Sequence, residues 1–279
     1  MPTFAFSQVD VFAPAPLTGN PVAVVHDAVG LTDEQLAAFA RWTNLSETTF
    51  LLPPTEPGAD YRLRIFTPGG ELPFAGHPTL GSAHAFLEQG GRPTDPEMIV
   101  QQCQLGLIRL RRNGNHLAFA APELLRSGPV DADTIAMAER ALGIGPDQLV
   151  RANWIDNGPG WLGIQLTSAD DVLALRPDFA AMGELNIGVI GAHQQGGPAD
   201  FEVRAFCPDL AVPEDPVTGS LNAGFALWLI RSGAAPANYT VRQGTALRRH
   251  GQVEISSEAD GTIWVGGASR TLISGTLTL

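Results

Sequence analysis

One stretch of this chain recurs in its second half, and the duplication limits the possible folds more than any other feature. YRLRIFTP (61–68) aligns without a gap with FEVRAFCP (201–208). Both stretches alternate apolar and polar residues and end at a proline, which predicts a β-strand and its exit turn. A sequence written twice in this way predicts two structurally similar halves.

A similar turn follows each predicted strand, ELPFAGHPTLG (71–81) in the first half and EDPVTGSLNAG (214–224) in the second. Beyond Gly76 and Gly219, a glycine, an alanine, a branched aliphatic residue and another glycine recur at the same offsets. Each segment predicts one helix bounded by glycines. In the second, Ser220 is the expected N-cap, and LNAGFALWLI is apolar nearly all round, so this helix should be enclosed. The match continues faintly, with IVQQ (99–102) against TVRQ (240–243).

The remaining segments complete an α+β fold. LTDEQLAAFARWTN (31–44) and DADTIAMAERALGI (131–144) predict amphipathic helices, and the stretch around Asn113-Gly114 predicts an antiparallel hairpin. We therefore expect two pseudo-symmetric domains. The first covers residues 1–121, with about 268–279 returning to it, and the second covers 122–267.

The duplication also predicts a binding site in the cleft between the two domains. Two helix N-termini aimed at one ligand would hold a carboxylate with their unpaired N–H groups, and Gly76 and Gly219 would let the backbone approach it closely. The alternative is that both glycines only permit tight turns.

The two turns differ at the residues that can do chemistry. Leu72 in the first becomes Asp215 in the second, and His77 becomes Ser220. His77, Asp215 and Ser220 are therefore candidate site residues. Each also has an ordinary structural explanation, as a helix-start residue, a turn residue before proline and a helix cap, respectively.

Composition excludes several functions. The formal charge of −12 argues against a nucleic-acid partner, and the absence of lysine excludes a pyridoxal-phosphate Schiff base and a complete Walker-type loop. The six histidines and two cysteines form no metal-ligand pattern, so no metal site is expected. No apolar run has the length of a membrane span and MPTFAFSQVD lacks the features of a signal peptide, which predicts a cytoplasmic protein.

Motifs spread over nearly the whole chain resemble those of the PhzF-like family of phenazine-biosynthesis isomerases: LTGNPVAV (17–24), NLSETTF (44–50), FTPGGELPFAGHP (66–78), EDPVTGS (214–220) and RQG (242–244). The resemblance implies a diaminopimelate-epimerase-like fold, in which each of two domains rolls a small mixed sheet around a central helix. It also implies a homodimer.

The resemblance further implies cofactor-free proton transfer on a small cyclic or α-substituted carboxylate, as in trans-2,3-dihydro-3-hydroxyanthranilate isomerase. Glu47 of NLSETTF would be the general acid/base and should have a raised pKa. His77 and Asp215 would bind substrate and assist proton movement, and Gly76, Gly219 and Ser220 would bind its carboxylate. From the residues alone, Glu47 could equally be a solvated residue at a strand start.

Two alternatives remain at this stage. Racemases and epimerases of the same superfamily use one cysteine on each side of the substrate, but the matching positions here are Ala75 and Thr218, which cannot act as thiol bases. Cys103 and Cys207 lie elsewhere in the sequence. The second alternative is a non-catalytic small-molecule-binding protein that has kept the fold. Gly19 and Asn20 are expected to be structural.

Overall fold

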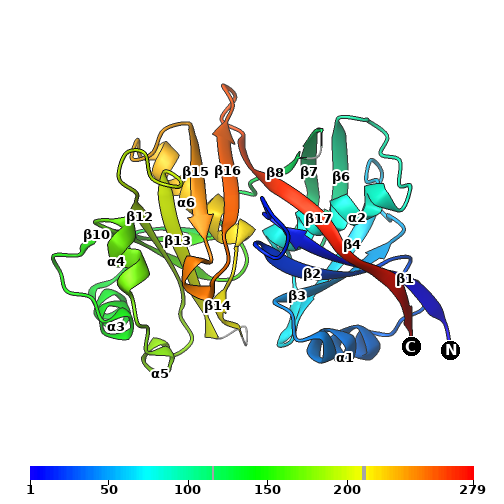
Figure 1. The fold of residues 1–279 in the computed structure, drawn as a ribbon, viewed down its shortest axis with the longest axis horizontal. Helices are drawn as coiled ribbons and strands as arrows, with labels where there is room; N and C mark the ends of the chain where they lie inside the picture. Colours follow the sequence, from blue (N-terminus) through cyan, green and yellow to red (C-terminus); the bar gives the residue numbers. More distant parts are fainter. Residues whose placement is uncertain (115, 209–211) are drawn as a thin grey trace. The chain divides into compact units, whose positions relative to one another are not determined.

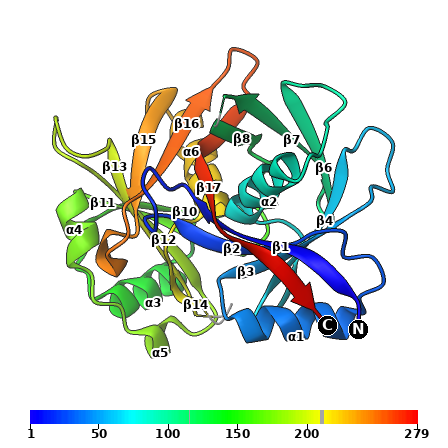
Figure 2. The ribbon, with the colours of Figure 1, turned by 45° about the vertical axis from the view of Figure 1, so that its right-hand side comes forward.

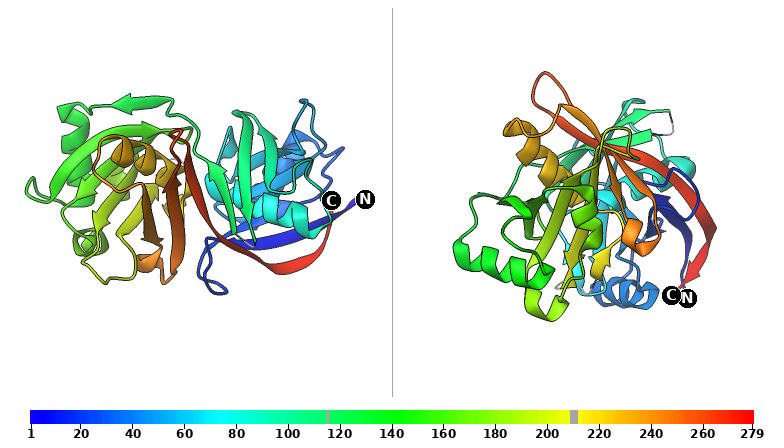
Figure 3. Two further views of the ribbon diagram at one scale, coloured as in Figure 1. Left: turned by 90° about the horizontal axis from the view of Figure 1, so that it is seen from above. Right: turned by 60° about the vertical axis from the view of Figure 1, so that its left-hand side comes forward.

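The computed structural model describes residues 1–114, 116–208 and 212–279, which form two compact units (Figure 1). Unit 1 comprises Met1–Ala120 and Gly266–Leu279, and unit 2 comprises Ala121–Val265. Strand β17 (Ile263–Thr278) begins in unit 2 and continues through unit 1. There it pairs antiparallel with β1, so that the two termini lie side by side (Figure 3).

Among its described residues, unit 1 contains two helices and eight strands besides its part of β17. The helices are α1 (Asp33–Thr43) and α2 (Gly76–Glu88). The strands are β1 (Thr3–Val11), β2 (Asn20–Val25), β3 (Glu47–Leu52), β4 (Tyr61–Thr67), β5 (Gly70–Leu72), β6 (Met98–Cys103), β7 (Gly106–Asn113) and β8 (His116–Ala120).

Unit 2 has the same kinds of element. Its helices are α3 (Ala132–Leu142), α4 (Ala169–Ala174), α5 (Phe179–Met182) and α6 (Gly219–Arg231), with a 3₁₀ turn at Thr245–Leu247. Its strands are β9 (Arg126–Gly128), β10 (Leu149–Asp156), β11 (Trp161–Leu166), β12 (Asn186–Ala192), β13 (Phe201–Cys207), β14 (Val212–Asp215), β15 (Asn238–Gln243) and β16 (Gly251–Ser257).

The two units pair their strands in the same order, which gives the sequence repeat a structural counterpart. In unit 1, β1–β2 is antiparallel, β2–β3 parallel, β3–β4 and β4–β5 antiparallel, β4–β6 parallel and β6–β7 antiparallel. The series β10, β11, β12, β13, β14, β15 and β16 repeats every one of these relations in unit 2.

The register of the antiparallel pairs shows which residues of the two turns correspond. Ile65 pairs with Leu72 in unit 1, and Ala205 pairs with Asp215 in unit 2. Because Ile65 and Ala205 hold the same place in the duplicated strand, Leu72 and Asp215 are structural equivalents.

The register of the parallel pairs aligns β6 with β15. Tyr61, at the start of its strand, pairs with Gln101, and its counterpart Phe201 pairs with Val241. Counting on to the end of each strand, Cys103 corresponds to Gln243. The alignment of IVQQ with TVRQ is therefore wrong by one position, because the loops between strand and helix differ in length.

Each unit encloses one helix of the repeat. Helix α2 packs against β1, β2, β3, β4, β6 and β8, inside the curved sheet of unit 1 (Figure 2). Helix α6 packs against β10, β11 and β16 and is buried over most of its length, as its apolar sequence predicts. The repeated glycines permit this close packing. A Cβ at Gly81 would lie 2.4 Å from Val22 Cγ1, and one at Gly224 would lie 2.5 Å from the backbone oxygen of Ile155.

The opposite face of each sheet is covered by other helices. In unit 1, Leu36 and Phe39 of α1 form a cluster with Phe50 and Phe66 of the sheet. In unit 2, Ala138, Ala141 and Leu142 of α3, with residues of α4 and α5, cover strands β10, β11 and β12. Helix, sheet and helix thus form successive layers in each unit.

Several local predictions are confirmed. The helix expected over 31–44 is α1, with Thr32 as N-cap in a full capping box, and that expected over 131–144 is α3. The stretch around Asn113-Gly114 forms the β7–β8 hairpin. Within the described ranges, no helix has both the length and the apolar sequence that crossing a membrane requires.

The predicted helix cap at Ser220 is wrong. Helix α6 begins at Gly219 with Thr218 as its N-cap, two residues before the predicted cap, so Ser220 lies within the first turn. Ser220 Oγ instead accepts a hydrogen bond from the indole N–H of Trp161 at 3.1 Å. Its side chain therefore serves a tertiary contact that the local sequence does not reveal.

Candidate active site

Two of the predicted site residues meet in unit 1. Glu47 is the first residue of β3, and His77 is the second residue of α2. His77 Nε2 lies 3.3 Å from Glu47 Oε2, and the two side chains are 2% and 12% exposed. The N-terminal ends of a strand and of the enclosed helix thus bring together two titratable groups that lie far apart in the sequence.

Burial keeps the His77 imidazole neutral. It lowers the pKa of His77 to about 3, and a hydrogen bond with the backbone of Pro21 offsets only part of this effect. Asn20 Nδ2 lies 3.3 Å from His77 Nδ1. A neutral imidazole carries one proton, which serves either the Pro21 backbone oxygen or Glu47, and the tautomer decides between these two contacts. Asn20, expected to be only structural, also contacts His77.

The neighbouring Gly19 fits its structural prediction. Its N–H donates to Asp10 Oδ1 at 3.1 Å, and a Cβ at this position would lie 2.0 Å from the backbone oxygen of Val11. Only glycine fits between these groups.

The other predicted polar residues lie in unit 2. Asp215 is the last residue of β14 and is buried, and its Oδ2 accepts a hydrogen bond of 2.6 Å from Thr218 Oγ1. Gly219 and Ser220 open helix α6 shortly after this strand. Besides the Trp161 contact, the backbone oxygen of Ser220 accepts from Asn157 Nδ2 at 2.9 Å, so the start of α6 is held firmly.

A buried amide that the sequence reasoning did not single out joins this group. Gln243, at the end of β15, has no exposed surface. Its side chain hydrogen-bonds with the Thr218 N–H and hydroxyl, the Asp215 backbone oxygen and Asn222. The only signal in the sequence was its place in RQG.

Both enclosed helices offer backbone donors at their N-termini. In α2, the first intrahelical bond is donated by Thr79 to Ala75, and Pro78 has no N–H, which leaves Gly76 and His77 as donors without an acceptor within the helix. In α6, the N–H groups of Gly219 and Ser220 hold the same positions, because the first intrahelical bond runs from Asn222 to Thr218. Each helix thus presents the N–H groups of its first two residues at its N-terminus, an arrangement suited to a carboxylate.

The N-caps of these helices are Ala75 and Thr218, and neither carries a thiol. Cys103 and Cys207 are both buried and form no disulfide. Burial raises the pKa of the Cys103 thiol, which disfavours the thiolate needed by a base. No observation on the described residues therefore favours a two-thiol racemase.

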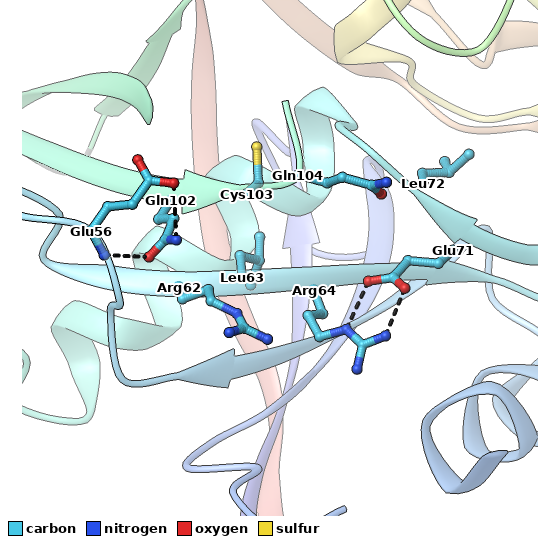
Figure 4. A pocket seen from close by; sticks show the side chains of 9 residues that line it. All are labelled: Glu56, Arg62, Leu63, Arg64, Glu71, Leu72, Gln102, Cys103 and Gln104. Carbon is cyan, nitrogen blue, oxygen red and sulfur yellow. Dashed lines mark hydrogen bonds and ion pairs between the residues drawn. The ribbon is translucent and has the colours of Figure 1, made fainter. Parts of the chain in front are cut away.

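A surface pocket of about 440 Å³ lies elsewhere on unit 1 (Figure 4). Its walls are formed by Glu56, Arg62, Leu63, Arg64, Glu71, Leu72, Gln102, Cys103 and Gln104. None of the predicted site residues lines it. Two of its walls are fixed by hydrogen bonds, from Arg64 to Glu71 and from the backbone N–H of Glu56 to Gln102.

The Arg64–Glu71 pair explains two residues of the repeat. The guanidinium binds both carboxylate oxygens at 2.7 and 2.6 Å, and Arg204 binds Glu214 in the same way in unit 2, at 2.9 and 2.8 Å. Each pair ties the strand to the turn that precedes the enclosed helix. The duplicated arginine and glutamate are therefore structural, whereas the residues next to them, Leu72 and Asp215, differ.

Comparison with known proteins agrees with this fold. The profile of the PhzC-PhzF family, described as phenazine biosynthesis-like protein, matches residues 9–278. The chain is 40% identical over 295 residues to antisense-enhancing sequence 1 of Schizosaccharomyces pombe, covering 99% of both chains. It is 38% identical over 231 residues to trans-2,3-dihydro-3-hydroxyanthranilate isomerase of Pseudomonas fluorescens, covering 81% of this chain and 79% of the relative.

Solved structures give the same result. A crystal structure of a PhzF-family phenazine biosynthesis protein from Enterococcus faecalis superimposes with a TM-score of 0.80 at 26% identity, covering all of both chains. A hydroxyproline epimerase from Agrobacterium vitis, at 11% identity and a TM-score of 0.59, shares the fold over 99% of this chain and 91% of its own. The fold is thus the mixed α/β fold of PhzF structures, shared with proline-type epimerases and racemases.

The chain belongs to the PhzC-PhzF family. It is an isomerase of that family, as the trans-2,3-dihydro-3-hydroxyanthranilate isomerases among its relatives indicate.

Proposed function

We propose that this isomerase moves a proton between two carbon atoms of a small cyclic or α-substituted carboxylate, with Glu47 as the general acid/base and without a cofactor. The observation that carries the proposal is the 3.3 Å contact between Glu47 and a buried, neutral His77 at the N-terminus of α2. A carboxyl group that is largely shielded from water beside a neutral polar side chain can accept and return a proton.

In this mechanism, the Glu47 carboxylate removes a proton from a substrate C–H bond. The electrons of that bond shift into the adjacent unsaturated system, and the Glu47 carboxylic acid then returns the proton to a different carbon. In the tautomer that carries its proton on Nε2, His77 donates to the carboxylate and so orients it. Because the proton that leaves one carbon is delivered to another, the reaction is balanced without an oxidant or a second substrate.

The substrate carboxylate would be bound by the backbone N–H groups of Gly76 and Gly219 and by Ser220, with Asp215 as a second polar partner. This assignment takes donors from each copy of the repeat. It is supported by the duplicated helix N-termini and by the asymmetric polar residues, which complement each other: a Glu–His pair in unit 1 and an Asp–Thr–Gln group in unit 2. The trans-2,3-dihydro-3-hydroxyanthranilate isomerases among the relatives indicate the class of substrate.

Solvent exchange tests this proposal. The protein is incubated in D₂O with trans-2,3-dihydro-3-hydroxyanthranilate and a panel of cyclic amino acids, and proton NMR follows the loss of each C–H signal. We expect exchange or isomerisation of at least one free carboxylate and none of its methyl ester, because the ester lacks the charge that two helix N-termini bind. Equal exchange of acid and ester would contradict the carboxylate assignment.

Variants of each unit test whether both act on one substrate. Glu47→Gln in unit 1 and Asp215→Asn in unit 2 should each reduce exchange strongly, while Glu34→Gln on the exposed face of α1 should not. If Asp215→Asn exchanges at the wild-type rate, the assignment of unit 2 to this reaction is wrong.

A further inference from the structure

We propose that Gln243 is a positioning residue for the site of unit 2: its amide sets the direction of the hydrogen bond from Thr218 to Asp215 and thereby fixes the Asp215 carboxylate. The expected effect on rate rests on the proposed function. The arrangement of hydrogen bonds among Gln243, Thr218 and Asp215 does not, and it can be tested without turnover.

The surroundings of Gln243 determine which way its amide faces. One of its terminal atoms lies 3.0 Å from the backbone nitrogen of Thr218 and 2.9 Å from Asn222 Nδ2. A backbone N–H can only donate, so this atom is the oxygen, Oε1. Asn222 Nδ2 also donates to the Thr218 backbone oxygen at 2.8 Å, which fixes the orientation of Asn222 in the same way.

The other terminal atom of Gln243 is therefore the NH₂ group. It donates to the backbone oxygen of Asp215 at 3.2 Å and to Thr218 Oγ1 at 2.9 Å. All four bonding positions of the amide are thus filled. Because Gln243 has no exposed surface, water cannot replace any of these partners.

The direction of the next bond follows. The Thr218 hydroxyl has one hydrogen, and its oxygen already accepts a hydrogen bond from Gln243. Its hydrogen consequently points to Asp215 Oδ2, 2.6 Å away. A donor aimed at a carboxylate favours the ionised form and holds one oxygen in place, so that Oδ1 is the oxygen that Thr218 leaves for other partners.

The duplication provides independent support, because unit 1 lacks all three residues of this hydrogen-bond network. Leu72 corresponds to Asp215 in the strand register, Ala75 to Thr218 as the helix N-cap, and Cys103 to Gln243 as the last residue of the strand. Unit 1 forms the same sheet and encloses the same helix without them. The fold therefore does not require this hydrogen-bond network. Its role is to position Asp215, the residue of the three that can take part in the chemistry.

The test compares variants that break one link each. Gln243→Leu removes the amide, Thr218→Val removes the hydroxyl at nearly constant shape, and Thr218→Ser retains it. Gln101→Leu is the matched control: Gln101 is equally buried at the corresponding sheet region of unit 1, where it bonds Tyr61 and Thr79 rather than Asp215.

The first readout is the titration of the Asp215 carboxyl carbon by ¹³C NMR in protein labelled at aspartate, with Asp215→Asn identifying the signal. A lost hydrogen bond to a carboxylate costs about 1.5 kcal/mol or more, so Thr218→Val should raise its proton affinity by about tenfold. Gln243→Leu leaves the hydroxyl in place but no longer fixes it, so it should raise the proton affinity in the same direction by a smaller factor. Thr218→Ser and Gln101→Leu should leave it unchanged. The charged groups near this site are the same in every variant: the Arg204–Glu214 pair, and Arg242 of β15, which contacts His250.

The second readout is turnover of a compound identified by the exchange screen. Gln243→Leu and Thr218→Val should lower kcat at least tenfold with KM within about threefold, and Thr218→Ser should restore most of kcat. The proposal is overturned if neither Gln243→Leu nor Thr218→Val changes the Asp215 titration, or if Gln101→Leu changes it as much. If Gln243→Leu does not fold, the Asp215 titration in Thr218→Val alone decides the proposal. If no compound exchanges, the proposed function fails while the titration still decides this proposal.

Discussion

The two arginine–glutamate pairs allow one interaction to be compared with its own duplicate in the same protein. We consider Glu214→Gln in unit 2 and Glu71→Gln in unit 1, which remove the same charge from equivalent positions. Arg204 and Glu214 are 5% and 11% exposed, whereas Arg64 and Glu71 are 18% and 32% exposed. The two variants therefore differ chiefly in how far water can reach the arginine left behind.

Burial determines the size of each effect. Removing one partner of a buried ion pair costs about 3–5 kcal/mol, because the remaining charge loses its compensation. Arg204 keeps hydrogen bonds to the backbone oxygens of Val172 and Leu175, which places Glu214→Gln near the lower limit, at about 3 kcal/mol. In unit 1, water reaches Arg64 and Asp33 stays bound to it at 2.6 Å, so Glu71→Gln should cost about 1 kcal/mol or less.

Thermal unfolding followed by circular dichroism measures the difference. For a unit of this size, about 1 kcal/mol corresponds to roughly 2–4 °C, so Glu214→Gln should lower the Tm by about 6–12 °C and Glu71→Gln by less than about 4 °C. Where the units melt separately, tryptophan fluorescence assigns the transition that moves, because four of the five tryptophans lie in unit 2. Equal shifts for the two variants would refute the reasoning that burial sets the magnitude.

Two further predictions concern packing and pH. Gly224→Ala should destabilise the protein by more than Gly81→Ala. The added Cβ at Gly224 would meet the backbone oxygen of Ile155, whereas that at Gly81 would meet a Val22 methyl group that can shift. Chemical denaturation measures both losses in unfolding free energy, expected at about 1–3 kcal/mol, and the opposite order would contradict the packing described. His77 has a folded pKa of about 3 against 6.5 when unfolded, so the unfolded state binds the extra proton between these values. Its contribution is therefore fully present above pH 6.5 and declines as the pH falls toward 3, by up to roughly 5 kcal/mol, and a His77→Gln variant should lack this part of the pH dependence in denaturation experiments.

The sequence predicted those features of the fold that leave a periodic or repeated pattern. The offsets shared by the two glycine-bounded segments correspond to helices that pack so closely that a Cβ would clash, and the two copies of the strand pair with their neighbours in the same order. The helix over 31–44 was predicted from purely local signals, and α1 begins there, directly after its N-cap Thr32.

The site was less accessible, because its contacts join residues far apart in sequence. Glu47 meets His77 only once strand and helix have packed, and nothing local to NLSETTF distinguishes a catalytic glutamate from a solvated one. Gln243 reaches Thr218 across 25 residues, and Ser220 was misread as a cap because its true partner, Trp161, lies 59 residues away. The differences between the two copies pointed to Asp215 and already matched Ala75 with Thr218, but only the strand register showed that Cys103 stands in the place of Gln243.

The central claim is that the Glu47 carboxyl group carries the proton. The most direct measurement is the rate of C–H exchange by Glu47→Gln at saturating concentration of a compound that the wild-type protein exchanges, together with its dissociation constant by calorimetry. General acid/base catalysis contributes about 10²–10⁴-fold, so we predict a loss of at least a hundredfold in rate with a dissociation constant changed by less than about threefold. Exchange within about tenfold of the wild-type rate, with binding intact, would contradict the assignment.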